Sequence, residues 1–114
     1  MALEKEYQFW MDKRVTPIGL NRYDWMRQPD EQMKHYAKMM RERITESQTL
    51  SEEEAARGLA SAGESGWDLT PRMGCHTYYY APADLNSLLY AMERNLAYSS
   101  HLFGRIINNI WRNA

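Results

Sequence analysis

Apolar residues recur along this chain at intervals of three and four positions, which is the spacing of one face of an α-helix. Alternation of apolar and polar residues, the mark of a half-buried strand, is almost absent. The pattern therefore predicts an all-α fold of four or five helices. They are expected over residues 3 to 12, from Pro29 or Asp30 to about Ser47, from Ser51 to Gly63, from Asp84 to Gly104, and from Arg105 to Arg112.

Capping signals support several of these boundaries. Ser51 followed by Glu54 is a capping box, in which each residue's side chain satisfies a backbone N–H of the other. Asp84 is placed to cap the fourth helix at its start. Gly63 is expected to end the third helix, and Gly104 to end or kink the fourth.

A long irregular loop around residues 64 to 83 is predicted between the third and fourth helices, and it holds the best candidate for chemistry. A run rich in Ala and Glu stops at a Gly, and Trp67 and Asp68 follow at once. Loops held by a rigid scaffold are where binding and catalytic side chains concentrate. Trp67 offers a stacking surface to a sugar ring, and Asp68 offers a proton donor. The Tyr-rich residues 77 to 80 are expected to be extended.

Four motifs of this chain resemble those of the trehalase family of glycoside hydrolases. Four matches in the same order, over roughly residues 3 to 96, are more specific than any one of them alone. They are Leu-Glu-Lys-Glu-Tyr-Gln-Phe-Trp-Met from Leu3, Asn-Arg-Tyr from Asn21, Glu-Ser-Gly-Trp-Asp from Glu64 with Arg72 after it, and Pro-x-Asp-Leu-Asn-Ser-Leu-Leu-Tyr from Pro82.

The resemblance implies a ring of six helical hairpins, an (α/α)6 toroid, of which this chain would be a fragment. Twelve helices of about 11 to 12 residues each, with their loops, need more than the 114 residues present. Residues 1 to 114 are therefore expected to form a single partial glycosidase-like helical domain.

The resemblance also implies an activity: hydrolysis of the disaccharide α,α-trehalose to glucose with inversion, with Asp68 as the general acid. Inversion needs a second carboxylate that activates water. In the family that base lies far downstream, as does a Gln-Trp-Asp signature, and this sequence contains neither. The isolated chain is therefore expected to be incomplete as an enzyme. On residue type alone, Asp68 fits a turn or helix cap, which is the commoner role of an Asp in a loop, and that alternative stays open.

Six further residues are candidates for substrate binding: Gly66, Trp67, Arg72, Arg27, Asp30 and Glu31. Gly66 would allow the backbone to approach a sugar closely, whereas Trp67 and Arg72 would stack on it and hydrogen-bond to its hydroxyl groups. Arg27 with one of the two acids would fill the place of an Arg-Pro-Glu-type triplet of the family, in an altered order. The alternatives are a helix C-cap for Gly66, packing and pairing at the surface, and a solvated helix start.

Two observations keep other functions open. Leu69-Thr70-Pro71 and Met73 differ from the commonest Phe-Ser-Ser and Trp of the family, so a related glycoside is a possible substrate. Eight Met, eight Tyr and four Trp are more large side chains than a few short helices can hide. The second hypothesis is a non-catalytic truncated helical module that binds a partner chain. The partner would be a complementary barrel segment or a second copy of the chain.

Composition argues against several other classes. A formal net charge of −1, with charged residues of both signs at 25%, disfavours nucleic acid and anionic membranes as partners. No apolar run is long enough to span a bilayer, and the start lacks the order of a secretion signal, so a cytoplasmic location is expected. No metal or other cofactor is expected, because the Cys75–His76 pair, His35 and His101 lack metal-ligand spacing.

Overall fold

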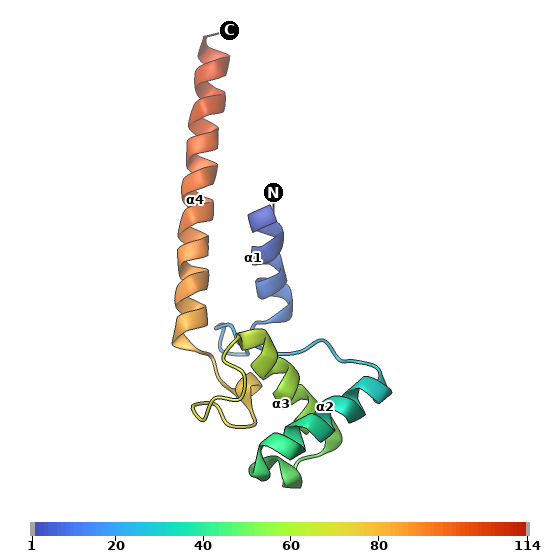
Figure 1. Cartoon of the computed structure of the whole chain (residues 1–114). Helices are drawn as coiled ribbons and strands as arrows, with labels where there is room; N and C mark the ends of the chain where they lie inside the picture. The colour runs from blue at the N-terminus through green and yellow to red at the C-terminus, as the bar shows by residue number, and fades with distance from the viewer. Residues whose placement is uncertain (1, 114) are drawn as a thin grey trace.

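The computed structural model describes residues 2 to 113, which form four α-helices and two short 3-10 helices (Figure 1). Within these residues there is no strand, and the sheet-like pairing consists of one isolated bridge between Val15 and Asn21. The all-α prediction is confirmed. The helices are α1 (Ala2–Lys13), α2 (Asp30–Arg43), η1 (Thr45–Thr49), α3 (Glu52–Ser65), η2 (Thr77–Tyr79) and α4 (Ala83–Arg112).

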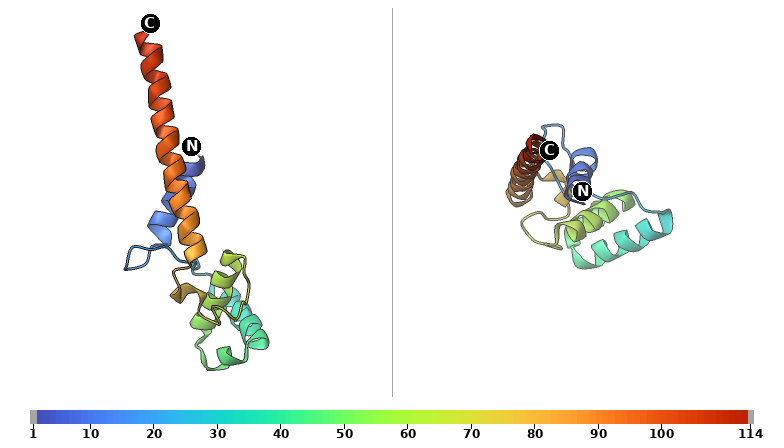
Figure 2. Two further views of the ribbon diagram at one scale, coloured as in Figure 1. Left: turned by 90° about the vertical axis from the view of Figure 1, so that its left-hand side faces the viewer. Right: turned by 90° about the horizontal axis from the view of Figure 1, so that it is seen from above.

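The helices are arranged in two parts. In one, residues 30 to 79 form the α2–α3 unit, in which α2 and α3 pack against each other. In the other, α1 lies antiparallel beside the first half of α4, as Figures 1 and 2 show, and we refer to this pair as the α1–α4 hairpin. Because α4 continues well past α1, the molecule is elongated, with extents of 68 × 27 × 23 Å.

The core of the α2–α3 unit is built from small and flexible apolar side chains. Met33, Ala37 and Met40 recur at helical spacing and form the buried face of α2. The surface that they pack against is formed by Ala55, Ala56 and Cys75. Small side chains at a helix contact reduce the distance between the helix axes.

Gly58 of α3 marks a close approach between backbones in this unit. A Cβ atom at this position would lie 2.2 Å from the carbonyl oxygen of Cys75 and 3.2 Å from the Cε atom of Met40. Only glycine leaves room for such a contact. The loop that follows Asp68 is therefore packed directly on α3, which fixes where that loop can run.

The capping box of α3 is confirmed. The Ser51 hydroxyl accepts a hydrogen bond from the Glu54 N–H at 3.1 Å, and the Glu54 carboxylate accepts one from the Ser51 N–H at 3.1 Å. The predicted end at Gly63 is wrong, because α3 continues to Ser65 and its C-cap is Gly66 in the left-handed conformation. Glycine ends a helix where the chain turns left-handed, and that turn is made at Gly66.

Two predictions for the last third of the chain are also wrong. Residues 105 to 112 are the end of α4 and not a fifth helix. An interior glycine costs a helix only about 1 kcal/mol relative to Ala, and neither Pro nor a run of turn residues follows Gly104 to stop it. The segment predicted to be extended forms η2 instead, which buries Tyr78 and leaves Tyr79 and Tyr80 exposed.

The α1–α4 hairpin has a much thinner core. Trp10 and Met11 of α1 pack on Leu85 and Leu89 of α4, with Tyr23 of the connecting loop between them. Farther along, the distal half of α4 (residues 98 to 112) exposes a series of large apolar side chains: Tyr98, Leu102, Phe103, Ile106, Ile110 and Trp111.

Candidate functional site

The residues Gly66, Trp67 and Asp68 form a tight turn directly after α3. The φ angles of Gly66 and Asp68 are 73° and 50°, so two left-handed residues flank Trp67. Asp68 is the only non-glycine residue between positions 2 and 113 with a positive φ. This conformation is strained for most residues, although Asp tolerates it better than others. The Trp67 N–H donates to the Ser65 hydroxyl at 3.1 Å, which ties the turn to the end of α3.

The carboxylate of Asp68 is accessible. Its side chain is exposed to solvent, and no group among residues 2 to 113 donates a hydrogen bond to it. An Asp that caps a helix or a turn accepts a hydrogen bond from a nearby backbone N–H. In this fold, both oxygens of Asp68 are open to groups from outside the described chain.

Trp67 and Arg72 meet at the carboxylate of Asp84. The Trp67 indole Nε1–H donates to Asp84 Oδ2 at 3.0 Å, and Arg72 Nη2 lies 3.6 Å from the same oxygen. The Arg72 guanidinium also lies over the Trp67 ring, 5.3 Å from its centroid. All three side chains are at least partly exposed to solvent. Two candidates for substrate binding are thus brought together beside Asp68 by a third residue.

The role predicted for Asp84 as the cap of the fourth helix is wrong. The N-cap of α4 is Pro82, and Asp84 lies in the first helical turn with one oxygen, Oδ1, accepting from the Leu85 N–H at 3.0 Å. Burial alone would raise the pKa of the Asp84 carboxyl. The hydrogen bonds from Leu85 and Trp67, together with the charge of Arg72, outweigh it and lower that pKa.

The other predicted binding residues lie elsewhere. Arg27 and Asp30 form an exposed ion pair at 3.4 Å next to the start of α2, where Glu31 is exposed as well. In Figure 1 this end of α2 lies on the opposite side of the α2–α3 unit from the loop that follows α3. The structure therefore groups Gly66, Trp67, Asp68 and Arg72, and it keeps Arg27, Asp30 and Glu31 apart from them.

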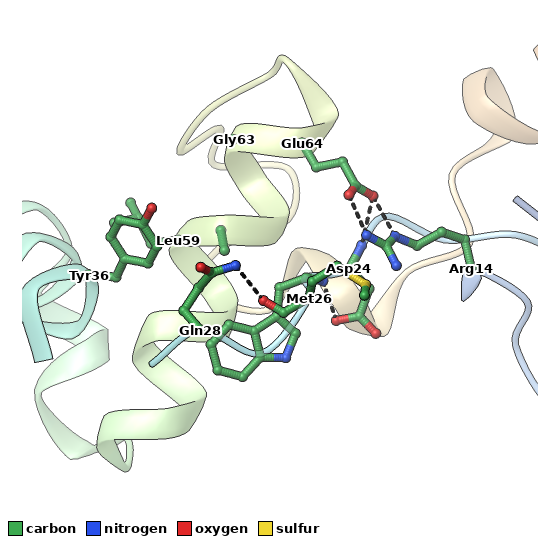
Figure 3. A pocket seen from close by; sticks show the side chains of 10 residues that line it. Arg14, Asp24, Met26, Gln28, Tyr36, Leu59, Gly63 and Glu64 are labelled. Carbon is green, nitrogen blue, oxygen red and sulfur yellow. Dashed lines mark hydrogen bonds and ion pairs between the residues drawn. The ribbon is translucent and has the colours of Figure 1, made fainter. Parts of the chain in front are cut away.

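A pocket of about 450 Å³ lies between α3 and the segment before α2 (Figure 3). Tyr36 and Leu59 lie at one end and Arg14 and Glu64 at the other, and Asp68 is not part of its lining. The remaining lining residues are Asp24, Trp25, Met26, Gln28, Ala60 and Gly63. Its polar end is occupied by an ion-pair network, which the sequence analysis did not anticipate.

The network is centred on Glu64, the first residue of the Glu-Ser-Gly-Trp-Asp motif. Both Glu64 oxygens accept from Arg14, at 2.8 Å from Nε and 2.6 Å from Nη2, and Oε1 also accepts from the Asp24 N–H at 3.2 Å. Asp24 in turn accepts two hydrogen bonds from Arg57, at 2.8 and 2.7 Å. Burial opposes ionisation of Asp24, yet the hydrogen bonds from Arg57 and from the Trp25 backbone lower its pKa. Glu64 therefore fixes the position from which the turn at Asp68 starts.

Comparison with known proteins decides the family. The trehalase family model matches residues 1 to 114, the whole chain. The chain belongs to the trehalase family. Its all-α structure is accordingly a fragment of the (α/α)6 toroid of that family, as predicted.

Several curated trehalases are similar to this chain over most of its length. The periplasmic trehalase of Citrobacter koseri is 32% identical over an alignment of 128 positions, which covers 90% of this chain and 22% of that protein. The trehalase of Dictyostelium discoideum is 30% identical over an alignment of 118 positions, which covers 83% of this chain and 19% of that protein. A periplasmic trehalase of Escherichia coli is 31% identical, with 90% and 22% covered. The chain thus spans about a fifth of the length of these relatives. No solved structure matches it.

A pair of asparagines joins two of the trehalase-like motifs. The Asn21 N–H donates to Asn86 Oδ1 at 2.8 Å, and Asn86 Nδ2 donates to the Asn21 carbonyl at 2.9 Å. Asn21 Nδ2 also donates to the Trp10 carbonyl at 2.9 Å, at the end of the first motif. The Asn-Arg-Tyr loop is thereby held against both α1 and α4. In this chain, several motif residues serve to position backbone segments.

No group of three or more His, Cys, Asp or Glu side chains among residues 2 to 113 is arranged to hold a metal ion. None of the helices in the same residues is long and apolar enough to cross a membrane.

Proposed function

We propose that this chain is the part of an inverting α,α-trehalase that carries the general acid, Asp68. The single observation that carries the proposal is the left-handed backbone conformation of Asp68. Left-handed non-glycine residues cluster at functional sites, and Asp68 is the one such residue that the structure has between positions 2 and 113. It lies within the Glu-Ser-Gly-Trp-Asp motif of a chain that belongs to the trehalase family.

The surroundings of Asp68 support a role in sugar hydrolysis. Trp67 is 56% exposed, so its indole ring is available to stack on a sugar. Arg72 lies beside it and presents N–H donors for hydroxyl groups. Gly66 has no neighbouring atom within 4 Å of a Cβ position, so its backbone is open to approach. The proposed substrate is the neutral disaccharide trehalose.

The chemistry requires groups that would come from outside this chain. Protonation of the glycosidic oxygen by Asp68 would be accompanied by attack of water on the opposite face of the sugar, activated by a second carboxylate. We propose that the rest of the ring supplies this base and covers Asp68. Removal of a carboxyl group from water favours its protonated form, which is the form a general acid needs. Arg27, Asp30 and Glu31 remain proposed contacts of the substrate, and a cytoplasmic location remains a prediction.

The test is glucose release from trehalose, measured with the chain alone and with the chain mixed with the polypeptide encoded directly downstream. We expect release only in the mixture, with α- and β-glucose first appearing in equal amounts by NMR, because inversion at the attacked carbon gives β-glucose while the leaving glucose stays α. Asp68→Asn should lower kcat by about 10²- to 10⁴-fold, the usual contribution of general acid catalysis. Asp12→Asn, on the exposed side of α1, is the matched control. An Asp68→Asn variant with wild-type kcat would disprove the role of Asp68.

A second candidate function is association without catalysis, and the distal half of α4 favours it. Leu85, Leu89 and Met92 belong to the apolar cluster between α1 and α4, and they follow one another at spacings of four and three residues. The same heptad spacing leads to Phe103 and Ile110, which are exposed. In this alternative, a complementary segment of the ring or a second copy of the chain covers them. Sedimentation velocity of the chain distinguishes the cases, since a self-associating chain sediments faster as its concentration rises and Phe103→Ser removes that increase.

A further inference from the structure

We propose that Asp84 is a positioning residue: it holds Trp67 and Arg72 in place, and through them it sets the direction in which Asp68 faces the sugar. This inference rests on the proposed function, because it assigns a purpose to the geometry around the proposed acid. Asp84 itself touches neither the substrate nor the reacting atoms in this account. It acts from α4 on a loop that belongs to a different motif.

The two oxygens of Asp84 have separate tasks. Oδ1 accepts from the Leu85 N–H and is thus bound to its own helix. Oδ2 receives the Trp67 indole N–H at 3.0 Å and lies 3.6 Å from Arg72 Nη2. The contact of the Arg72 guanidinium with the Trp67 ring closes a triangle of three side chains. A favourable interaction with the helix dipole alone would not require Asp84 to contact Arg72 and Trp67, which lie 12 and 17 positions earlier in the chain.

Asp84 lies on a rigid part of the fold. It lies in the first turn of the 30-residue helix α4, where the helix dipole favours a carboxylate. The next residue, Leu85, is 3% exposed and belongs to the core of the hairpin with Tyr23 and Leu89. The backbone of Asp84 therefore cannot shift without disturbing that core.

The segment that Asp84 holds has little support of its own. Trp67 and Asp68 are exposed, and besides the contacts with Asp84 and Arg72 the turn is fixed by two hydrogen bonds, from Trp67 N to the Ser65 hydroxyl and from Gly66 N to the Gly63 carbonyl. Exposed turns with few packing contacts are the parts of a protein that open most readily. A single acceptor on a rigid helix is therefore sufficient to decide where the Trp67 ring rests and, with it, how the following residue is oriented.

The experiment follows the order of the turn by ¹⁵N NMR relaxation in the full 114-residue chain. The Trp67 indole N–H resonance is assigned by its loss in Trp67→Phe. In Asp84→Ala we expect this resonance to shift and the order parameters of Trp67 and Asp68 to fall from about 0.85 to below about 0.6, which separates rigid from flexible backbone. Asp84→Asn keeps an oxygen acceptor for the indole and should retain most of the order. Asp12→Asn, an exposed acid on α1, should leave the turn unchanged.

The outcomes separate this inference from the proposed function. Order parameters in Asp84→Ala that change only at residues 83 to 86, or nowhere, would overturn the inference, because they leave Asp84 with a helix-terminal role alone. In the glucose assay, Asp84→Ala should lower kcat about tenfold with little change in KM, and Asp84→Asn should lie close to wild type. A failure of the proposed function appears separately, as catalysis that does not depend on Asp68, and it does not alter the NMR result.

Discussion

The α2–α3 unit and the α1–α4 hairpin hide their apolar side chains to very different degrees. In the first, Met40, Ala55 and Ala56 are completely buried, and the loop after α3 packs on Gly58. In the second, the buried cluster consists of Tyr23 from the loop after α1 and of Leu85 and Leu89 from the part of α4 that faces α1. The α2–α3 unit resembles the interior of a domain, whereas the α1–α4 hairpin resembles one side of an interface.

The difference follows from the size and placement of the side chains. Ala, Gly and Met allow two short helices and a loop to pack closely, so a unit of about fifty residues forms a dense core. The Leu, Ile and aromatic residues of α4 extend along a 30-residue helix, but α1 has only 12 residues with which to cover them. Exposed apolar surface of this extent marks a site of association. The exposed apolar side chains of α4 agree with the match to the trehalase family, since the chain spans only about a fifth of the length of its trehalase relatives.

The largest effect that would test the comparison is expected at Gly58. In Gly58→Ala the new methyl group would meet the Cys75 carbonyl oxygen, which belongs to backbone and cannot rotate away. We expect a loss of about 3 kcal/mol in the free energy of unfolding, at the upper end of overpacking effects. Urea denaturation followed by far-UV circular dichroism measures it.

Gly63→Ala is the matched control for this prediction. Gly63 lies in the same helix, and a Cβ atom there would have no neighbour within 4 Å. Relief of the glycine cost should therefore stabilise the chain by about 0.5 to 1 kcal/mol. Equal stability of the two variants would show that α3 and the loop are not in close contact.

Helix positions could be predicted from this sequence largely because their signals are local. The capping box at Ser51 and the apolar faces of α1 and α2 involve residues three or four positions apart, and the structure confirms them. The helix ends predicted at Gly63 and Gly104 were wrong because they too were inferred from single local residues. A glycine permits a left-handed turn, but the packing of the surrounding chain decides whether that glycine adopts the backbone angle that ends the helix.

The geometry of the candidate site could be predicted only in part. Trp67, Asp68 and Arg72 lie close in sequence, and their grouping on one loop followed from that alone. The contacts that hold them come from afar: Glu64 meets Arg14 across 50 positions, and Asp84 meets Trp67 across 17. Such pairs leave no periodicity in the sequence, because their spacing is determined by how the helices pack. Whether Asp68 acts as the general acid stays a prediction.

A smaller effect is expected in the thin core of the hairpin. Leu89→Ala removes a 4% exposed side chain from the contact with α1, and we expect a loss of about 2 kcal/mol, the low end for a buried Leu. Phe103→Ala removes a larger side chain on the same helix, but Phe103 is 65% exposed, so the change should stay within about 0.5 kcal/mol. Thermal unfolding of both variants provides the measurement. A Phe103→Ala chain as unstable as Leu89→Ala would mean that the distal half of α4 is already covered in solution.

The smallest effect concerns the connection between the two regions. Glu64, at the end of α3, binds Arg14, which directly follows α1 and is only 3% exposed. Glu64→Gln keeps one oxygen acceptor but removes the charge, so a loss of about 1.5 kcal/mol is expected, the low end for one hydrogen bond to a charged group. Glu42→Gln is the control, because its pair with Lys38 is 3.9 Å long and exposed, and such pairs contribute little.

Urea unfolding monitored by circular dichroism and by Trp fluorescence provides a second readout of the Glu64–Arg14 ion pair. If this ion pair couples the hairpin to the α2–α3 unit, the two transitions coincide in wild type and separate in Glu64→Gln. If they coincide in both, the Asp24–Arg57 and Trp67–Asp84 contacts are sufficient to keep the two regions folding as one.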